Sequence, residues 1–124
     1  MNKTMQLFSY KKTDFVNCDE RGKLVQILHK NCKQVNLLIS KKGTMRGNHY
    51  HKKAKESFFI ITGDVKVIFS YKDQKEEKTF KQDDFFEIYP LVKHEMYFLS
   101  DCTMIAIYNR NIDRIFCGKD IFKE

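Results

Sequence analysis

Three histidines and one glutamate are spaced so that a fold could gather them into one site. His49 and His51 are separated by one residue, and alternate side chains of an extended strand point to the same face. Glu56 follows the basic stretch 52–55, where the chain could reverse and return a carboxylate to the imidazoles. His94 offers one more imidazole downstream. We expect these four residues to bind a divalent transition metal such as Zn, Fe, Mn, Ni or Co, which imidazole and carboxylate ligands suit.

The same histidines also suit proton transfer, because imidazole titrates near neutral pH. Moving a proton on a carbon beside a ketone needs a base, an acid and a positive group near the developing oxyanion. A cation or Arg46 could supply that charge. A ring nitrogen that ligates a metal cannot also be a free base, so the two roles of His49 and His51 compete. In the metal-bound case the candidate proton carriers are Tyr50, Tyr97, Lys93 and a water on the metal.

The elements that position these residues are expected to be short strands. Apolar and polar residues alternate over short stretches, and no long stretch repeats with the period of a helix. The pattern predicts strands over 6–10, 13–17, 23–29, 34–40, 45–51, 56–62, 65–71, 78–81, 85–89, 94–99 and 103–108. Turn signals separate them at short intervals, which is typical of an all-β barrel or sandwich. The length of 124 residues and the absence of a linker predict one domain spanning residues 1–124.

The charge and composition of the chain indicate which kinds of binding partner to expect. The net charge of +7 comes from lysines spread along the chain, whereas a nucleic-acid-binding protein more often gathers them on one stripe. The lysines are therefore expected to form a solvated surface; the alternative is that Arg46 and nearby lysines attract a phosphate-bearing small molecule. We expect no nucleic-acid partner and no membrane partner. The apolar runs are too short to cross a bilayer, and the N-terminus has no signal-peptide pattern, so we expect a cytoplasmic protein. The cysteines lack metal-type spacing and are expected to be free thiols: Cys18, Cys32, Cys102 and Cys117.

The spacing of the histidines resembles the first sequence motif of the cupins. The matching pattern is Gly43-x5-His49-x-His51-x4-Glu56-x6-Gly63. The stretch around His94 resembles the second cupin motif more loosely. This resemblance implies an all-β, single-domain cupin, that is, a double-stranded β-helix or jelly-roll barrel whose mouth holds the ligand.

A narrower resemblance covers most of the chain. Residues 19–25, 41–53, 63–67, 94–97 and 101–102 are similar to stretches of the sugar-nucleotide 3,4-ketoisomerases, the WxcM-like cupins that act on dTDP-4-keto-6-deoxyhexoses. Residues 46–51 also resemble the cupin domain of capsular polysaccharide epimerase-reductases. The resemblance implies an isomerase or epimerase acting on a nucleotide-linked 4-keto-6-deoxy sugar in cell-surface polysaccharide biosynthesis.

The resemblance also implies roles for individual residues. His49 and His51 would exchange protons with the sugar, with Tyr97 as a further catalytic candidate. Arg46 would meet the diphosphate or the sugar. Lys93 is a second candidate substrate contact, although the ketoisomerases often carry tryptophan at this position.

Three further features follow from the comparison with the ketoisomerases. Those enzymes generally lack the glutamate ligand, so Glu56 is a departure that favours a metal. No organic cofactor is implied. The family commonly forms homodimers by exchanging N-terminal strands, which the strands before Asn17 could supply here.

Two other functions fit the same residues. The chain could be a metal-dependent, dioxygenase-like cupin, because three histidines and a glutamate suit iron. It could also be a non-catalytic cupin that binds a metal or a sugar, since a fold does not fix a function. Oxygen uptake with Fe(II) would favour the first, and binding without turnover the second.

Overall fold

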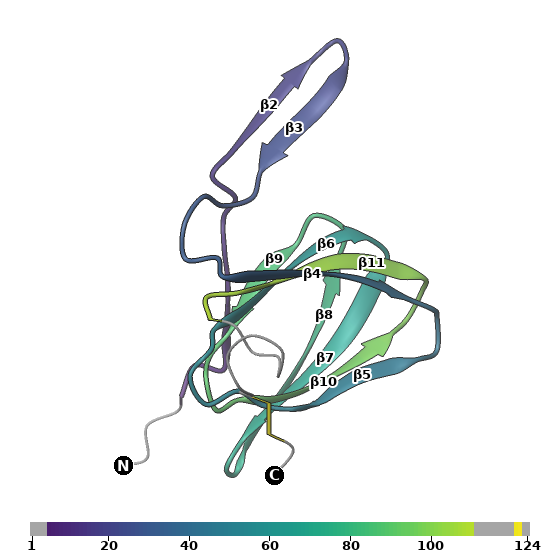
Figure 1. The fold of residues 1–124 in the computed structure, drawn as a ribbon. Coiled ribbons are helices and arrows are strands. Elements are labelled where there is room, and N and C mark those ends of the chain that lie inside the picture. Colours follow the sequence, from purple (N-terminus) through teal and green to yellow (C-terminus); the bar gives the residue numbers. More distant parts are fainter. Residues whose placement is uncertain (1–4, 111–120, 123–124) are drawn as a thin grey trace.

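Eleven strands and no helix make up the part of the chain that the computed structural model describes, residues 5–110 and 121–122. The strands are β1 (Phe8–Tyr10), β2 (Phe15–Asp19), β3 (Gly22–Gln26), β4 (Gln34–Ser40), β5 (Met45–His49), β6 (Glu56–Thr62), β7 (Asp64–Tyr71), β8 (Gln74–Lys81), β9 (Phe85–Ile88), β10 (Lys93–Phe98) and β11 (Cys102–Tyr108). The expected all-β barrel is confirmed (Figure 1). Within the described residues no helix is long and apolar enough to cross a membrane.

Two antiparallel sheets enclose the barrel interior (Figure 1). The five-stranded sheet has the order β1-β9-β6-β11-β4, and the four-stranded sheet has the order β5-β10-β7-β8. Strands β4 and β5 are consecutive in the chain and lie at the edges of different sheets, so residues 41–44 close one side of the barrel. Gly43 allows this tight connection with a φ of 84°, a conformation that other residues rarely adopt.

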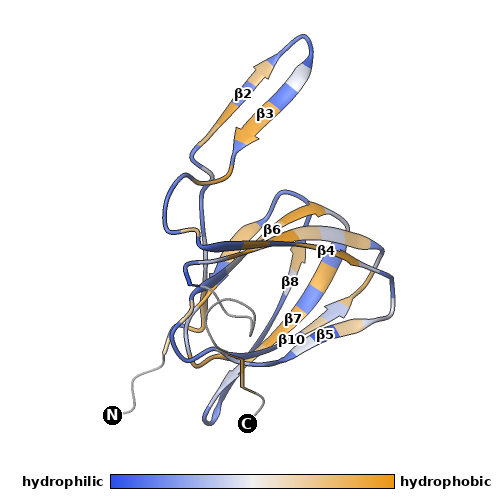
Figure 2. Ribbon diagram, viewed as in Figure 1, coloured by the Kyte–Doolittle hydropathy of each residue, from blue (hydrophilic) through white to orange (hydrophobic). Residues whose placement is uncertain are grey.

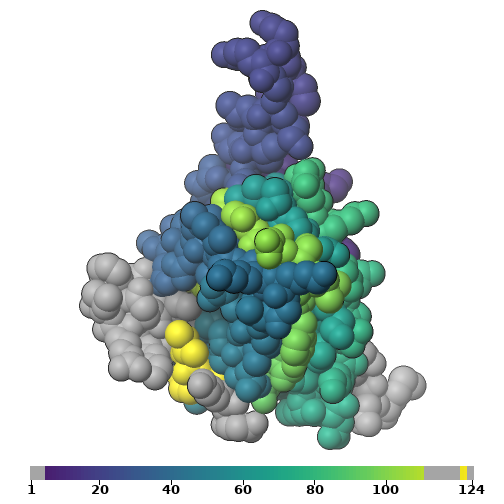
Figure 3. Space-filling model, turned by 90° about the vertical axis from the view of Figure 1, so that its right-hand side faces the viewer, coloured from purple at the N-terminus to yellow at the C-terminus, as the bar shows by residue number. Residues whose placement is uncertain are grey.

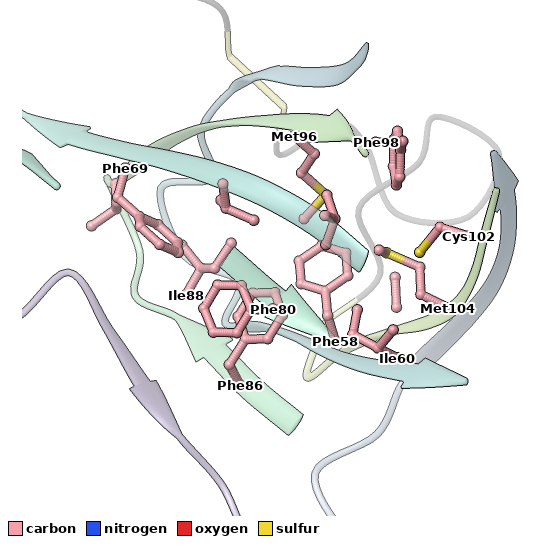
Figure 4. Packing of buried hydrophobic residues seen from close by; sticks show 14 of the residues in the cluster. Phe58, Ile60, Phe69, Phe80, Phe86, Ile88, Met96, Phe98, Cys102 and Met104 are labelled. Carbon is pink, nitrogen blue, oxygen red and sulfur yellow. The ribbon is translucent and has the colours of Figure 1, made fainter. Parts of the chain in front are cut away.

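The interior is filled by alternate side chains of the strands. In β7, Val65, Val67 and Phe69 are fully buried, and the residues between them are partly exposed. Phe80 of β8 stacks on Phe86 of β9 with ring centroids 3.7 Å apart, which joins the two sheets across the core (Figure 4). Burying each such large apolar side chain stabilises the fold by about 1.5–3 kcal/mol.

Strands β2 and β3 form a hairpin that stands away from the barrel (Figures 1 and 3). Every residue of β2 is exposed, although both strands of the hairpin contain hydrophobic residues (Figure 2). Phe15, Val16 and Leu24 are each about half exposed. An isolated two-stranded hairpin is marginally stable in water, so this segment needs a covering surface.

The structure corrects several details of the expected strands. The strand expected over 78–81 is longer, because β8 begins at Gln74 and pairs along its whole length with β7. Strand β6 is buried on both faces only as far as Ile60, and Ile61 is exposed. Beyond the last expected strand, Phe122 forms an isolated bridge with Tyr50. The structure shows Cys18, Cys32 and Cys102 as free thiols, and Cys117 lies outside the described residues.

Candidate metal centre

The pairing of β5 with β10 brings two of the histidines together. His49 lies opposite His94, and their ring centroids are 4.7 Å apart. The register shifts beside this pair, where Gly47 and Asn48 have φ values of 97° and 64° and form an irregularity in β5. A Cβ on Gly47 would lie 2.7 Å from the carbonyl oxygen of His94. Glycine therefore allows the two strands to approach closely at the histidines.

His51 and Glu56 flank the turn that joins the two sheets. His51 follows the end of β5, and its ring centroid is 5.0 Å from that of His49, as strand alternation predicts. Glu56 is the first residue of β6 and therefore belongs to the opposite sheet. Ala54, between them, is 1% exposed and anchors the turn in the core. The expected chain reversal over residues 52–55 is thus present.

The four side chains converge inside the barrel. One ligand atom from each of His49, His51, Glu56 and His94 lies within 4.8 Å of all the others. Glu56 Oε1 is 3.2 Å from His51 Nε2 and 3.0 Å from His94 Nε2. His51, Glu56 and His94 are buried, and His49 is half-buried. His94, the residue most distant in sequence, therefore faces the interior beside the other three.

Burial and mutual contacts set the charge of the cluster. Burial, followed by the charge of His94, lowers the pKa of His49 to about 4, so this imidazole is neutral at pH 7. Burial would raise the pKa of Glu56, but the charge of His94 and hydrogen bonds from His51 and His94 outweigh it and lower the pKa below its usual range. The cluster therefore presents an ionised carboxylate beside a neutral imidazole.

This donor set fits a divalent transition metal. Zinc ligands lie about 2.0–2.2 Å from the ion, so the corners of a tetrahedron are about 3.3–3.6 Å apart. The separations from Glu56 Oε1 to His51 and His94 are close to that edge length. Nitrogen and oxygen ligands also suit iron, manganese and nickel. The ring of His94 is held from its other side, where Nδ1 lies 3.4 Å from the carbonyl oxygen of Val92.

Arg46 lies at the edge of the barrel near this cluster. It is opposite Met96, whose side chain is buried, and it precedes His49 on the same edge strand. Its Nε donates a hydrogen bond of 2.8 Å to Ser40 Oγ on β4, so the side chain spans the gap between the two sheet edges. The arginine is exposed, and its guanidinium can meet an anion that approaches from solvent.

Tyr97 and Lys93 are placed differently from the sequence prediction. His94, Met96 and Phe98 of β10 are buried, so Lys93 and Tyr97 point to the outer face of the sheet. The Tyr97 hydroxyl donates to Glu95 Oε2 at 2.9 Å on that outer face. Neither Tyr97 nor Lys93 is therefore among the residues gathered inside the barrel.

Tyr50 also lies outside the cluster. This candidate proton carrier points away from the two histidines that flank it, and it is only partly buried. Its ring stacks on Phe122 with centroids 5.6 Å apart, and the two backbones form a bridge.

Tyr108 is a neighbour of the cluster that the motifs did not indicate. It ends β11 and lies opposite Glu56 in the pairing of β11 with β6. Its ring contacts that of His51, with centroids 5.8 Å apart. The alternation of Met104, Ala106 and Tyr108 places this residue on the inner face, but only the register between strands brings it to Glu56.

Comparison with solved structures identifies proteins of the same fold. QdtA, a sugar 3,4-ketoisomerase from Thermoanaerobacterium thermosaccharolyticum in complex with TDP, is 22% identical with a TM-score of 0.82, covering 98% of this chain and 90% of that one. The WlaRB TDP-quinovose 3,4-ketoisomerase from Campylobacter jejuni is 16% identical with a TM-score of 0.82, covering 97% and 95%. The dTDP-4-dehydrorhamnose 3,5-epimerase from Sulfolobus tokodaii is 19% identical with a TM-score of 0.69, covering 87% and 78%.

Comparison of the sequence with models of protein families identifies the family of this chain. No curated protein matches the sequence. The family model described as the polysaccharide biosynthesis C-terminal domain matches residues 17–117, which include the whole candidate metal centre. The chain therefore belongs to the polysaccharide biosynthesis C-terminal domain family and has the barrel fold of the nucleotide-sugar ketoisomerases and epimerases.

Proposed function

We propose that the chain is an isomerase or epimerase acting on a nucleotide-linked 4-keto-6-deoxy sugar in polysaccharide biosynthesis. The observation that carries this proposal is the buried quartet of His49, His51, Glu56 and His94 inside a barrel of this family. Solved structures with the same fold are named as 3,4-ketoisomerases and as a 3,5-epimerase of TDP or dTDP sugars. Both reactions move a proton on a carbon beside a ketone.

The proposal includes a divalent metal, Zn, Fe, Mn or Ni, held by the quartet. When bound, such an ion would polarise a carbonyl oxygen as a Lewis acid. Ring nitrogens that ligate it are not free bases, so we assign His49 and His51 to binding and not to proton transfer. The ionised Glu56 and the burial of three of the ligands support this choice. Elemental analysis of the purified protein tests it.

The charge around the cluster suits a nucleotide diphosphate. Arg46 bridges the sheet edges beside the histidines, and guanidinium groups bind phosphate with paired hydrogen bonds. The net charge of +7 would draw an anionic substrate toward the protein. We therefore propose that Arg46 contacts the diphosphate, in agreement with the role that the sequence resemblance implies.

Solvent exchange is the experiment that tests the reaction. We expect a dTDP-4-keto-6-deoxyhexose incubated with the protein in D2O to take up deuterium next to the ketone. Loss of the C3 proton together with deuterium at C4 of a 3-keto product would indicate 3,4-ketoisomerisation. Exchange at C3 alone would indicate 3-epimerisation, and exchange at both C3 and C5 would indicate 3,5-epimerisation. NMR and mass spectrometry measure these positions. If the folded, metal-loaded protein exchanges no position in any nucleotide keto-sugar supplied, the proposed activity is wrong.

A second candidate function rests on the ligand set alone. Three histidines and one glutamate also suit Fe(II) in an oxygenase. Oxygen consumption by the iron-loaded protein, together with no deuterium uptake in the keto-sugar, would favour this alternative. Zinc retained through purification, with no oxygen uptake, would disfavour it.

We propose a homodimer in which the β2–β3 hairpin of each copy packs on the other copy. The hairpin exposes apolar residues on both faces and needs a cover. A matching apolar surface exists on the outer face of β4, where Val35, Leu37 and Ile39 are 58%, 62% and 68% exposed. Strand β4 is also a sheet edge, whose unpaired backbone groups can accept another strand. If each copy placed its hairpin on strand β4 of the other copy, the hairpins and the apolar faces of β4 would all be covered, in a dimer with two-fold symmetry.

Charged substitutions in the hairpin test this dimer. We expect Val16→Glu combined with Leu24→Glu to convert the dimer to a monomer, because buried carboxylates would oppose packing against an apolar surface. Lys75→Glu on the exposed strand β8 is the control and should leave the dimer intact. Light scattering coupled to size-exclusion chromatography measures the mass. A wild-type monomer, or a dimer that survives the double substitution, would contradict the proposal.

We also propose a cytoplasmic location. Cys18 and Cys32 are exposed free thiols, and such thiols persist in reducing compartments. The described residues contain no helix that could span a membrane.

A further inference from the structure

Two residues near the C-terminus, Ile121 and Phe122, lie on the free edge of strand β5 beside the metal centre, and we call them the strap. Phe122 forms a bridge with Tyr50, in which each backbone N–H donates to the carbonyl oxygen of the other residue, at 2.8 and 2.9 Å. Strand β5 pairs with β10 along its other side. The strap, yellow in Figures 1 and 3, therefore pairs with the one edge of this segment that β10 leaves open.

Side chains hold the strap on both faces of the bridge. The Phe122 ring stacks on the Tyr50 ring with centroids 5.6 Å apart, and Lys52 Nζ lies 4.4 Å from the centre of the Phe122 ring. Neighbouring residues of an extended chain point to opposite faces, so Ile121 lies on the same face as the two histidines that flank Tyr50. Ile121 is partly buried and packs against the hydrophobic core. The strap thus places one apolar side chain on the inner face of the barrel.

The strap adjoins the part of the quartet that is most open to solvent. His51, Glu56 and His94 are only 1–3% exposed, whereas His49 is half-buried. His49 is the last residue of β5 and directly precedes Tyr50, which forms the bridge. An ion that reaches the quartet along this edge therefore passes the strap.

The strap is held by fewer contacts than the strands beside it. In the described part of the chain it has one bridge with two backbone hydrogen bonds, one ring pair, one cation–π contact and the packing of Ile121. Strand β5, by contrast, pairs with β10 from Met45 to His49. Segments with few contacts open locally at a small part of the free energy of global unfolding. The strap can therefore be released while β5 stays paired with β10.

We propose that the strap covers the approach to the metal centre, and that its release sets the rate at which a metal ion enters and leaves the quartet. The inference rests on the proposed metal-binding function of the quartet. A cover of this kind changes the rates of uptake and release together, because the ion passes the same barrier in both directions. The dissociation constant is the ratio of the two rates and stays close to its original value.

Phe122→Ala is the main test, because it removes the ring pair and the cation–π contact and keeps the backbone of the bridge. We expect zinc uptake and zinc release to a chelator both to become about 10-fold faster, which corresponds to about 1.4 kcal/mol. Stopped-flow measurements with a zinc-sensitive dye give both rates. The dissociation constant and the visible spectrum of the Co(II)-substituted protein should stay as in the wild type. A residue that positioned the ligands would instead change both of these properties.

Tyr10→Ala is the matched control. The Tyr10 ring contacts that of Phe80 with centroids 5.6 Å apart, the same separation as in the pair of Tyr50 and Phe122. Tyr10 lies on β1, an edge strand of the other sheet, and is not part of the quartet. Tyr10→Ala should therefore keep the wild-type rates of zinc uptake and release. Phe122→Tyr, which keeps the ring of the strap, should also keep them.

A disulfide across the bridge tests the opposite change. Hydrogen-bonded partners on antiparallel strands have Cα atoms about 5.5 Å apart, a distance that a disulfide can span. The variant combines Tyr50→Cys with Phe122→Cys. It also carries Cys18→Ser, Cys32→Ser and Cys117→Ser, so that these thiols do not compete. We expect zinc uptake and release to be slower in the oxidised protein than after reduction with a phosphine.

Amide hydrogen exchange tests the strap without a metal. In the metal-free protein, the backbone amide of Tyr50 donates to the carbonyl oxygen of Phe122. We expect this amide to exchange about 10-fold faster in Phe122→Ala than in the wild type, because the bridge opens more often. NMR measures the exchange of this amide, and the same measurement on Tyr10→Ala should give the wild-type rate.

The outcomes separate this inference from the proposed function. A wild type that binds no zinc would overturn the metal centre together with the role of the strap. If zinc binds, and neither Phe122→Ala nor the disulfide changes the two rates, only the role of the strap is overturned. A Phe122→Ala variant with weaker zinc binding and an unchanged rate of uptake would also overturn it, because the strap would then hold the ligands in place.

Discussion

Replacing Glu56 by glutamine is expected to weaken zinc binding by about 100- to 1,000-fold. Structural zinc sites contribute about 10–16 kcal/mol through four ligands, so one ligand accounts for about 3–4 kcal/mol. Glutamine keeps the shape of the side chain but loses the negative charge, and its neutral amide is a weak ligand. Because Glu56 is the one carboxylate of the quartet, its loss also leaves the bound cation without a compensating charge. Chelator competition measures the change.

The control for this prediction is Glu87→Gln on the neighbouring strand β9. Glu87 lies on the outer face of the same sheet, where its carboxylate is 3.4 Å from Lys11 Nζ. This variant loses the same charge and should bind zinc like the wild type. Added zinc should raise the melting temperature of the wild type and of Glu87→Gln, because a ligand at 100 times its dissociation constant stabilises the native state by about 2.7 kcal/mol. A Glu56→Gln variant with the same zinc-induced stabilisation would show that Glu56 is not a ligand.

Much of the metal centre could be predicted from local spacing. His49 and His51 share a face because strands alternate with a period of two, and the turn before Glu56 is too short to carry the carboxylate far away. The same rule places Tyr97 on the face opposite to His94, since three positions separate them on one strand. The prediction of Tyr97 as a catalytic residue considered its residue type and not its direction on the strand.

Features that depend on pairing between distant strands could not be predicted in this way. Tyr108 reaches Glu56 only through the register of β11 with β6, which no local pattern specifies. The strands over residues 13–17 and 23–29 were expected, but their alternation does not show that they leave the barrel as a hairpin. The alternation of apolar residues shows which face of a strand is apolar. Whether that face packs in the barrel or lies on a projecting hairpin depends on the rest of the fold.

Gly47→Ala is expected to lower the free energy of unfolding by about 2–4 kcal/mol, because two effects combine. Alanine is strained at a φ of 97°, and its Cβ would lie 2.7 Å from the carbonyl oxygen of His94, a backbone atom that cannot move without shifting β10. Strand β5 must then move away from β10. Because His49 and His94 face each other across this pair, the shift should also weaken zinc binding.

Gly43→Ala separates the two effects. Gly43 has a similar φ of 84°, but no atom lies within 4 Å of the position that its Cβ would take. In this variant the free energy of unfolding should fall only by the cost of the strained backbone conformation, about 1–2 kcal/mol, and the zinc affinity should not change. Urea denaturation in the presence of a chelator measures the stability of both proteins without a metal, and chelator competition then measures zinc binding. Equal losses of stability in the two variants, with equal zinc affinities, would mean that the close approach of β5 to β10 at Gly47 does not hold the histidines in place.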